Sequence, residues 1–176
     1  MSPNFSFLEA GDERLARLAT LAERYFADDA AGALIKLRTF AELMAKEIAA
    51  RSGVLPPTSP TFDQVLSVLR ARSLLPREAA DLFYHLKRVG NAAAHEGEGN
   101  PQQVLAALKF AHALAVWFHR SYGGASTFKS GPFVPPRAPS EADAALRSEL
   151  DELRATVAAS RDADVWARSG RCGRRP

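Results

Sequence analysis

Cysteine is almost absent from this chain, since Cys172 is the single cysteine among 176 residues. One thiol excludes an internal disulfide framework and any metal site built from several cysteines. Histidine is also scarce, with four residues, and no histidine has cysteine and carboxylate neighbours at metal-ligand spacing. We therefore expect neither a bound metal nor a cofactor.

Long apolar runs are missing as well. No run approaches the ~18 residues that cross a bilayer, and residues 1–9 lack the basic start and apolar stretch of a signal peptide. The 47% hydrophobic and 24% charged residues are ordinary for a soluble globular chain. A length of 176 residues suits one domain with an appendage. These features predict a cytoplasmic protein that does not contact a membrane.

Charge is distributed unevenly along the chain. The net charge is +3 and the pI is about 9.3, which taken alone suggests a nucleic-acid partner. However, residues 161–176 hold five arginines against two aspartates, and the first 160 residues hold 18 basic and 18 acidic residues. The body is therefore neutral, and the basicity belongs to a tail that we expect to be disordered. This tail is either a degenerate end, such as a frameshifted terminus, or a basic arm for nucleic acid.

Apolar residues recur at spacings of three and four along most of the chain, which predicts amphipathic helices. The clearest series is Leu34, Leu37, Ala41, Met44 and Ile48. Proline, glycine and capping residues separate five such segments, and no segment reads convincingly as a strand. The predicted helices cover about residues 12–28, 30–51, 61–71, 76–96 and 100–122. We therefore predict an all-α bundle of about five helices over residues 1–122.

The composition changes after Tyr122. Residues 123–140 form a proline- and glycine-rich linker that cannot be helical, because proline removes a backbone donor and restricts the residue before it. Leu146, Leu150, Leu153 and Val157 follow at 4-3-4 spacing, which predicts the start of a coiled-coil-like helix over residues 141–160. This helix is too short for an independent coiled coil, and the basic tail over residues 161–176 follows it.

The predicted helix over residues 76–96 carries a polar stripe. At about 100° per residue, Arg88 and His95 differ by only ~20° around the axis and lie ~10.5 Å apart along it, with Asn91 between them. Leu82 and Leu86 lie on the opposite side, which is the expected core face. The three polar side chains are therefore predicted to face water, a second packing layer or a partner.

The other three histidines predict no chemistry of their own. His85 lies near the edge of the polar side of the same helix, and we expect it to face solvent. His112 and His119 are seven residues apart on one predicted helix, so they share a face. Because no triad of histidine, cysteine or carboxylate ligands lies near this pair in the sequence, it does not predict a metal site.

Several segments together carry a resemblance to a known family. They are Leu74–Glu78, Leu82–Phe83, Arg88–Glu96, Ala115–His119 and Gly131–Phe133. These segments resemble the helical N-terminal region of type I restriction endonuclease R subunits and related helicase-type proteins, a domain of unknown function grouped with the HEPN superfamily. The resemblance covers roughly residues 4–155 and implies a HEPN-like helical bundle that precedes a nuclease and a helicase. The phosphate loop of such a motor is absent from this sequence.

The same resemblance implies a candidate active site. HEPN ribonucleases carry an arginine and a histidine separated by about four to six residues, and Arg88 and His95 have six residues between them. The implied chemistry is metal-independent RNA cleavage, in which His95 would act as acid or base and Arg88 would hold the phosphate. Arg88, Asn91 and His95 are therefore the candidate catalytic residues. Lys87 and Arg88 are candidate nucleic-acid contacts.

Two features favour a role other than catalysis. Active members of the family place a polar residue directly after the arginine, whereas Val89 follows Arg88 here. A histidine such as His95 in the last turn of a helix also interacts favourably with the helix dipole. We therefore expect an accessory, assembly or nucleic-acid-associated helical module of a type I restriction-like DNA defence protein, present without nuclease and helicase and not an enzyme by itself.

Two alternatives stay open at the level of the sequence. One is a dimeric, metal-independent endoribonuclease that uses Arg88 and His95, since such sites are usually shared across a dimer. The other is a purely structural oligomerisation domain that leads into a coiled coil. In each case the expected partner is a second copy of the chain or a larger restriction complex, with DNA or RNA as a further possible partner.

Overall fold

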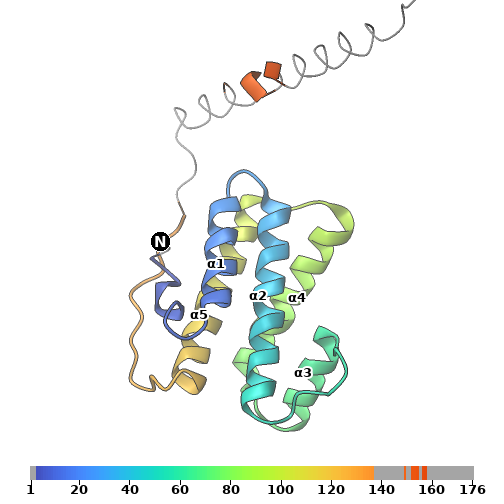
Figure 1. Cartoon of the computed structure of the whole chain (residues 1–176), viewed down its shortest axis with the longest axis vertical. Helices are drawn as coiled ribbons and strands as arrows, with labels where there is room; N and C mark the ends of the chain where they lie inside the picture. The colour runs from blue at the N-terminus through green and yellow to red at the C-terminus, as the bar shows by residue number, and fades with distance from the viewer. Residues whose placement is uncertain (1–2, 137–148, 150–151, 155, 158–176) are drawn as a thin grey trace, which may run out of the picture. The chain divides into compact units, whose positions relative to one another are not determined.

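Five α-helices make up most of the described chain. The computed structural model describes residues 3–136, 149, 152–154 and 156–157. The helices are η1 (Ser6–Leu8, a short 3-10 helix), α1 (Glu13–Tyr25), α2 (Ala30–Arg51), α3 (Phe62–Ala71), α4 (Arg77–Glu96) and α5 (Pro101–Tyr122) (Figure 1). No strand occurs in the described residues, so the predicted all-α bundle is confirmed. None of the described helices is long and apolar enough to cross a membrane.

The chain divides into two units, residues 1–136 and residues 137–176. In the second unit, the described residues 149, 152–154 and 156–157 are helical, within the segment predicted as a coiled-coil-like helix. The other residues of that segment and the basic tail over residues 161–176 lie outside the described residues. Those two expectations therefore stay predictions.

Helix α2 is the centre of the first unit. It contacts α1, α3, α4 and α5, and Figure 1 shows it between α1 and α4. Because neighbours surround it, apolar side chains are needed around much of its circumference. Its buried residues are Ala33, Leu34, Leu37, Phe40, Ala41, Met44, Ala45, Ile48 and Ala49. The four small alanines let the neighbouring helices approach closely, while the larger side chains fill the core.

Local signals in the sequence set the helix ends. Thr61 and Gln64 form a capping box at the start of α3, and Asn100 and Gln103 form another at the start of α5. Helix α4 ends at Glu96, and its C-cap residue Gly97 has a φ of 67°, in the left-handed region where glycine is favoured. These are the ends that the sequence predicted, because each cap satisfies backbone groups within a few residues of itself.

The segments before α1 and after α5 lie against each other. The Asn4 amide nitrogen donates to the Val134 carbonyl oxygen at 2.8 Å, and the Val134 N–H donates to Asn4 Oδ1 at 2.8 Å. The same amide nitrogen donates to Glu23 Oε1 at 2.6 Å. Asn4 is only 3% exposed, so these bonds satisfy a buried polar group. They hold part of the non-helical 123–136 segment on the helical bundle.

Candidate functional site

The polar stripe of α4 faces away from the core. Arg88 and His95 are exposed and Asn91 is half-buried. The buried residues of the helix are Ala79, Ala80, Phe83, Leu86, Gly90 and Ala93. The predicted outward direction of Arg88 and His95 is therefore confirmed. Leu82, expected at the centre of the core face, is half-buried, because the buried face is centred nearer Phe83 and Gly90.

A close approach to α2 fixes the rotation of α4. A Cβ atom placed on Gly90 would lie 2.3 Å from the Cβ of Arg38 and 2.9 Å from the carbonyl oxygen of Leu34. Only glycine fits there without displacing α2. Because Arg88 is two residues from Gly90, about 200° around the helix, it points away from this contact. Gly90 thus helps to determine which way the stripe faces.

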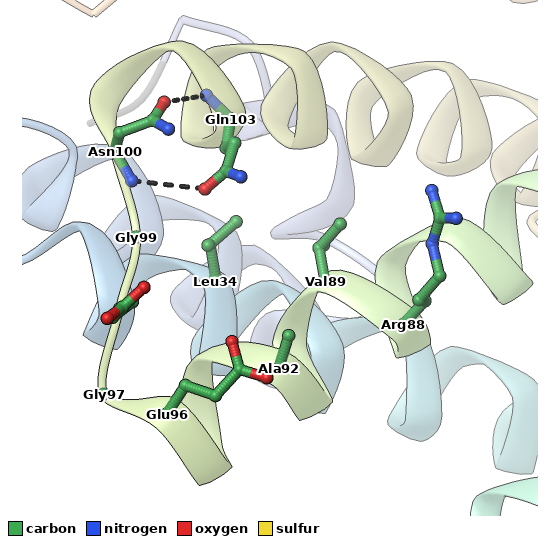
Figure 2. A pocket seen from close by; sticks show the side chains of 10 residues that line it. Leu34, Arg88, Val89, Ala92, Glu96, Gly97, Gly99, Asn100 and Gln103 are labelled. Atoms are coloured by element: carbon green, nitrogen blue, oxygen red, sulfur yellow. Dashed lines mark hydrogen bonds between the residues drawn. The ribbon is translucent and has the colours of Figure 1, made fainter.

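Arg88 lines a cavity of about 700 Å³ at the end of α4 (Figure 2). The lining consists of Leu34, Arg88, Val89, Ala92, Glu96, Gly97, Glu98, Gly99, Asn100 and Gln103. Figure 2 shows Arg88 at one end, Glu96 at the other, and the apolar side chains of Leu34 and Val89 between them. The Asn100–Gln103 capping box forms one edge, with its two hydrogen bonds at 3.3 and 2.9 Å. We call this space the α4–α5 cavity.

The α4–α5 cavity carries charges of both signs. Arg88 supplies a guanidinium, and Glu96 and Glu98 supply carboxylates. Among the described residues, none of these three groups has an ion-pair partner. Arg88 is therefore available for an external anion, while the two carboxylates make the same cavity less favourable for a polyanion such as a nucleic-acid backbone.

The cavity does not include the whole predicted triplet. Asn91 and His95 are absent from its lining, so the structure places Arg88 with Glu96 and Glu98 instead. Glu96 and Glu98 were not predicted from the sequence as site residues. The signal available in the sequence was that they flank Gly97, just before the Asn100 cap of the next helix. The left-handed turn at Gly97 sends the chain back past the end of α4, which is how Glu98 reaches the cavity.

The environment of His85 differs from the one that the sequence predicted. It was predicted to face solvent, but it is half-buried and packs edge-on against Phe110 of α5, with ring centroids 4.7 Å apart. The pKa of His85 is lowered, first by burial and then by the positive charge of Arg88. The contact arises because α4 and α5 pack side by side, a relation that the α4 sequence alone does not contain.

Lys87 is already engaged within the chain. Its ammonium group pairs with the carboxylate of Asp63 on α3, and it also lies 5.5 Å from the centre of the Tyr84 ring. An amine held by a carboxylate and an aromatic face has to leave both before it binds a phosphate. The nucleic-acid contact assigned to Lys87 stays a prediction, and Arg88 is the more available of the two cations.

Aromatic rings surround the second histidine pair. His112 and His119 share a face of α5 as predicted, and the Phe7 ring lies 6.2 Å from the first and 5.3 Å from the second. Phe133 lies 5.7 Å from His112, and Phe128 lies 4.8 Å from His119. Burial lowers the pKa of His112. In the described part of the chain, no group of three His, Cys, Asp or Glu side chains is placed to hold a metal ion.

Comparisons with known proteins relate this helical unit to a family. The model of DUF4145, a domain of unknown function, matches residues 20–130. The chain is also similar to the type I restriction enzyme EcoKI endonuclease subunit of Escherichia coli (strain K12), with 30% identity over 133 residues. This match covers 76% of the chain and 11% of the relative, so the chain spans about a tenth of that protein. No solved structure gives a match. Because the family model covers more than half of the sequence, including all of α2 to α5, this protein belongs to the DUF4145 family.

Proposed function

We propose that this chain is an accessory or assembly module of a type I restriction-like DNA defence protein. The similarity to the endonuclease subunit of a type I restriction enzyme is the observation that carries this proposal. The matched region is 11% of that relative, so it is one part of that protein. In this role the helical unit binds other parts of a restriction complex and places them near nucleic acid.

The α4–α5 cavity supports a role in assembly. It exposes a guanidinium at Arg88 and carboxylates at Glu96 and Glu98, and the apolar side chains of Leu34 and Val89 lie between them. Charges of both signs around an apolar centre suit a specific protein contact, because complementary pairs fix the orientation of the partner and exclude wrong partners. A surface for non-specific nucleic-acid binding is instead dominated by one sign of charge.

A chimaeric protein tests this proposal. The matched segment of the E. coli endonuclease subunit is deleted, or replaced by the corresponding residues of this chain, and restriction is measured as the loss of plating by unmodified phage. We expect the deletion to abolish restriction and the replacement to restore it at least in part. The replacement that carries Arg88→Glu should restore less restriction than the unaltered replacement. Arg77→Glu, an exposed change outside the cavity, is the control and should restore as much restriction as the unaltered replacement.

The chimaera also gives a clear contrary result. If the deletion restricts phage as well as the intact subunit does, the segment has no assembly role in that complex. If the replacement is inactive while the chimaera folds and is soluble, this chain does not perform the function of the matched segment. Either result contradicts the proposal.

The HEPN-type endoribonuclease is the second candidate, and one observation favours it. Arg88 and His95 are both exposed on one face of α4, and neither has a hydrogen-bond or ion-pair partner among the described residues. Both side chains are therefore free to meet an RNA strand, directly or together with a second copy of the chain. Val89 after Arg88 and the carboxylates of Glu96 and Glu98 near Arg88 count against this activity.

Cleavage of single-stranded RNA in the presence of EDTA decides between the two candidates. We expect no cleavage, because the carboxylates near Arg88 repel a phosphate backbone. A ribonuclease that used Arg88 and His95 would cut RNA without metal and leave 2′,3′-cyclic phosphate ends. It would lose activity in both Arg88→Ala and His95→Ala while the helical spectrum stayed intact. Lys109→Ala, an exposed change on α5, is the matched control.

A further inference from the structure

A second hollow lies between α1 and α2, away from the α4–α5 cavity. Its volume is about 570 Å³, and it is lined by Arg14, Arg17, Leu18, Leu21, Thr39, Glu42, Leu43 and Lys46. Figure 1 shows the two helices side by side, and they contact each other directly. We call this hollow the α1–α2 groove. None of its residues belongs to the stripe or to the cavity described above.

The floor of the α1–α2 groove is apolar. Leu18 and Leu21 of α1 and Leu43 of α2 are half-buried, so each keeps part of its side chain accessible. The residues of α1 that face the core are Leu15, Ala16, Ala19 and Ala22. Leu18 and Leu21 therefore lie outside the buried stripe of their helix. Three accessible leucines in one groove provide a site where a partner gains affinity by burying apolar side chains.

The rim of the groove is positively charged. Arg14 and Arg17 are exposed, and neither has an ion-pair partner in the described part of the chain. Glu42 is the one carboxylate in the lining, and it is already shared by two cations. Its Oε1 lies 2.8 Å from Lys46 Nζ, and its Oε2 lies 3.7 Å from the Arg38 guanidinium. The unsatisfied charge at the rim is therefore cationic.

We propose that the α1–α2 groove binds an acidic amphipathic helix of a protein partner. Two packed helices leave a groove between them into which the apolar face of a third helix fits. The partner's apolar side chains then contact Leu18, Leu21 and Leu43, and its Asp or Glu side chains pair with Arg14 and Arg17. An apolar floor between cationic rims selects for a peptide that is both amphipathic and acidic. This inference does not depend on the restriction-like function proposed above.

Fluorescence anisotropy with the full chain tests the groove. The probe is a labelled designed helix of about 18 residues, with leucines at i, i+4, i+7 and i+11 and glutamates at its flanking positions. The matched probe has lysines in place of the glutamates. We expect saturable binding of the acidic probe and at least about tenfold weaker binding of the basic probe. Raising the salt concentration should weaken the binding of the acidic probe.

Variants of the chain locate the site. Arg14→Glu combined with Arg17→Glu should weaken binding of the acidic probe at least about tenfold. Arg77→Glu, an exposed change at the start of α4, should leave it within about twofold. Leu21→Ser, at a half-buried position outside the core stripe, should also weaken binding. All three variants should keep the circular dichroism spectrum and melting temperature, because none removes a buried core residue.

Three results would overturn the inference. The first is no binding of the acidic probe up to about 1 mM. The second is equal binding of both probes, or binding that the arginine reversals do not change. The third is that a single-stranded oligonucleotide displaces the acidic probe, binds the chain more tightly than the probe does, and loses affinity in the same Arg14 and Arg17 variants. That last result would make the groove a nucleic-acid site.

Discussion

Gly90→Ala tests the close packing that orients α4. Helix propensity alone predicts that this change stabilises the protein by about 1 kcal/mol, because alanine is the better helix former. The structure predicts the opposite. The new Cβ would lie 2.3 Å from the Cβ of Arg38 and 2.9 Å from the carbonyl oxygen of Leu34. Neither atom is the free end of a flexible side chain, so α2 and α4 have to move apart.

The size of the effect follows from these distances. Carbon atoms in contact prefer a separation of about 3.5–4.0 Å, so the helices must separate locally by roughly 1 Å. Overpacking of this kind costs about 1–3 kcal/mol, and the upper part of that range applies because both obstructing atoms are fixed to α2. After the gain in propensity, we expect a net loss of about 1–2 kcal/mol. For a unit of this size, the melting temperature should fall by roughly 3–8 °C.

Urea denaturation followed by circular dichroism measures this loss. The matched control is Ala92→Gly, at an exposed position two residues further along α4. The control should cost about 1 kcal/mol through propensity alone. If Gly90→Ala leaves the free energy of unfolding unchanged or increases it, α2 yields easily at this contact. The contact at Gly90 would then not fix the direction of Arg88.

Three further predictions concern the core, the histidine cluster and the terminal segments. Leu86→Ala should lower the free energy of unfolding by about 2–5 kcal/mol in urea melts, because Leu86 is fully buried; a loss below about 1 kcal/mol would place it outside the core. Burial lowers the pKa of His112 in the folded state, so the unfolded state binds a proton more readily. The free energy of unfolding should therefore fall as the pH drops from the unfolded-state pKa of about 6.5 toward the lower folded-state pKa. His112→Gln should show less of this loss between pH 7.5 and 5, and an identical pH dependence would exclude His112 as its source. Asn4→Ala removes the hydrogen bonds to Val134 and should speed tryptic cleavage at Lys129 severalfold, whereas an unchanged rate would show that other contacts hold the segment.

The sequence by itself determined the secondary structure of the helical unit. Capping boxes at Thr61 and Asn100 and the left-handed glycine at Gly97 act within a few residues, so the ends of α3, α4 and α5 were predicted closely. Periodicity along one helix also placed Arg88 and His95 on a common outward face, because a helix fixes the angles between its own side chains. Both kinds of information are local to the chain.

Only the tertiary structure decided which side chains meet across elements. The turn at Gly97 places Glu98 in the same cavity as Arg88, and the packing of α5 on α4 covers His85 with Phe110. The carboxylate of Asp63 on α3 forms an ion pair with the ammonium group of Lys87. None of these neighbours follows from spacing along one helix, because helix rotation and crossing depend on the packing of side chains from different helices. The sequence therefore predicted the direction of the stripe, and the fold determined its surroundings.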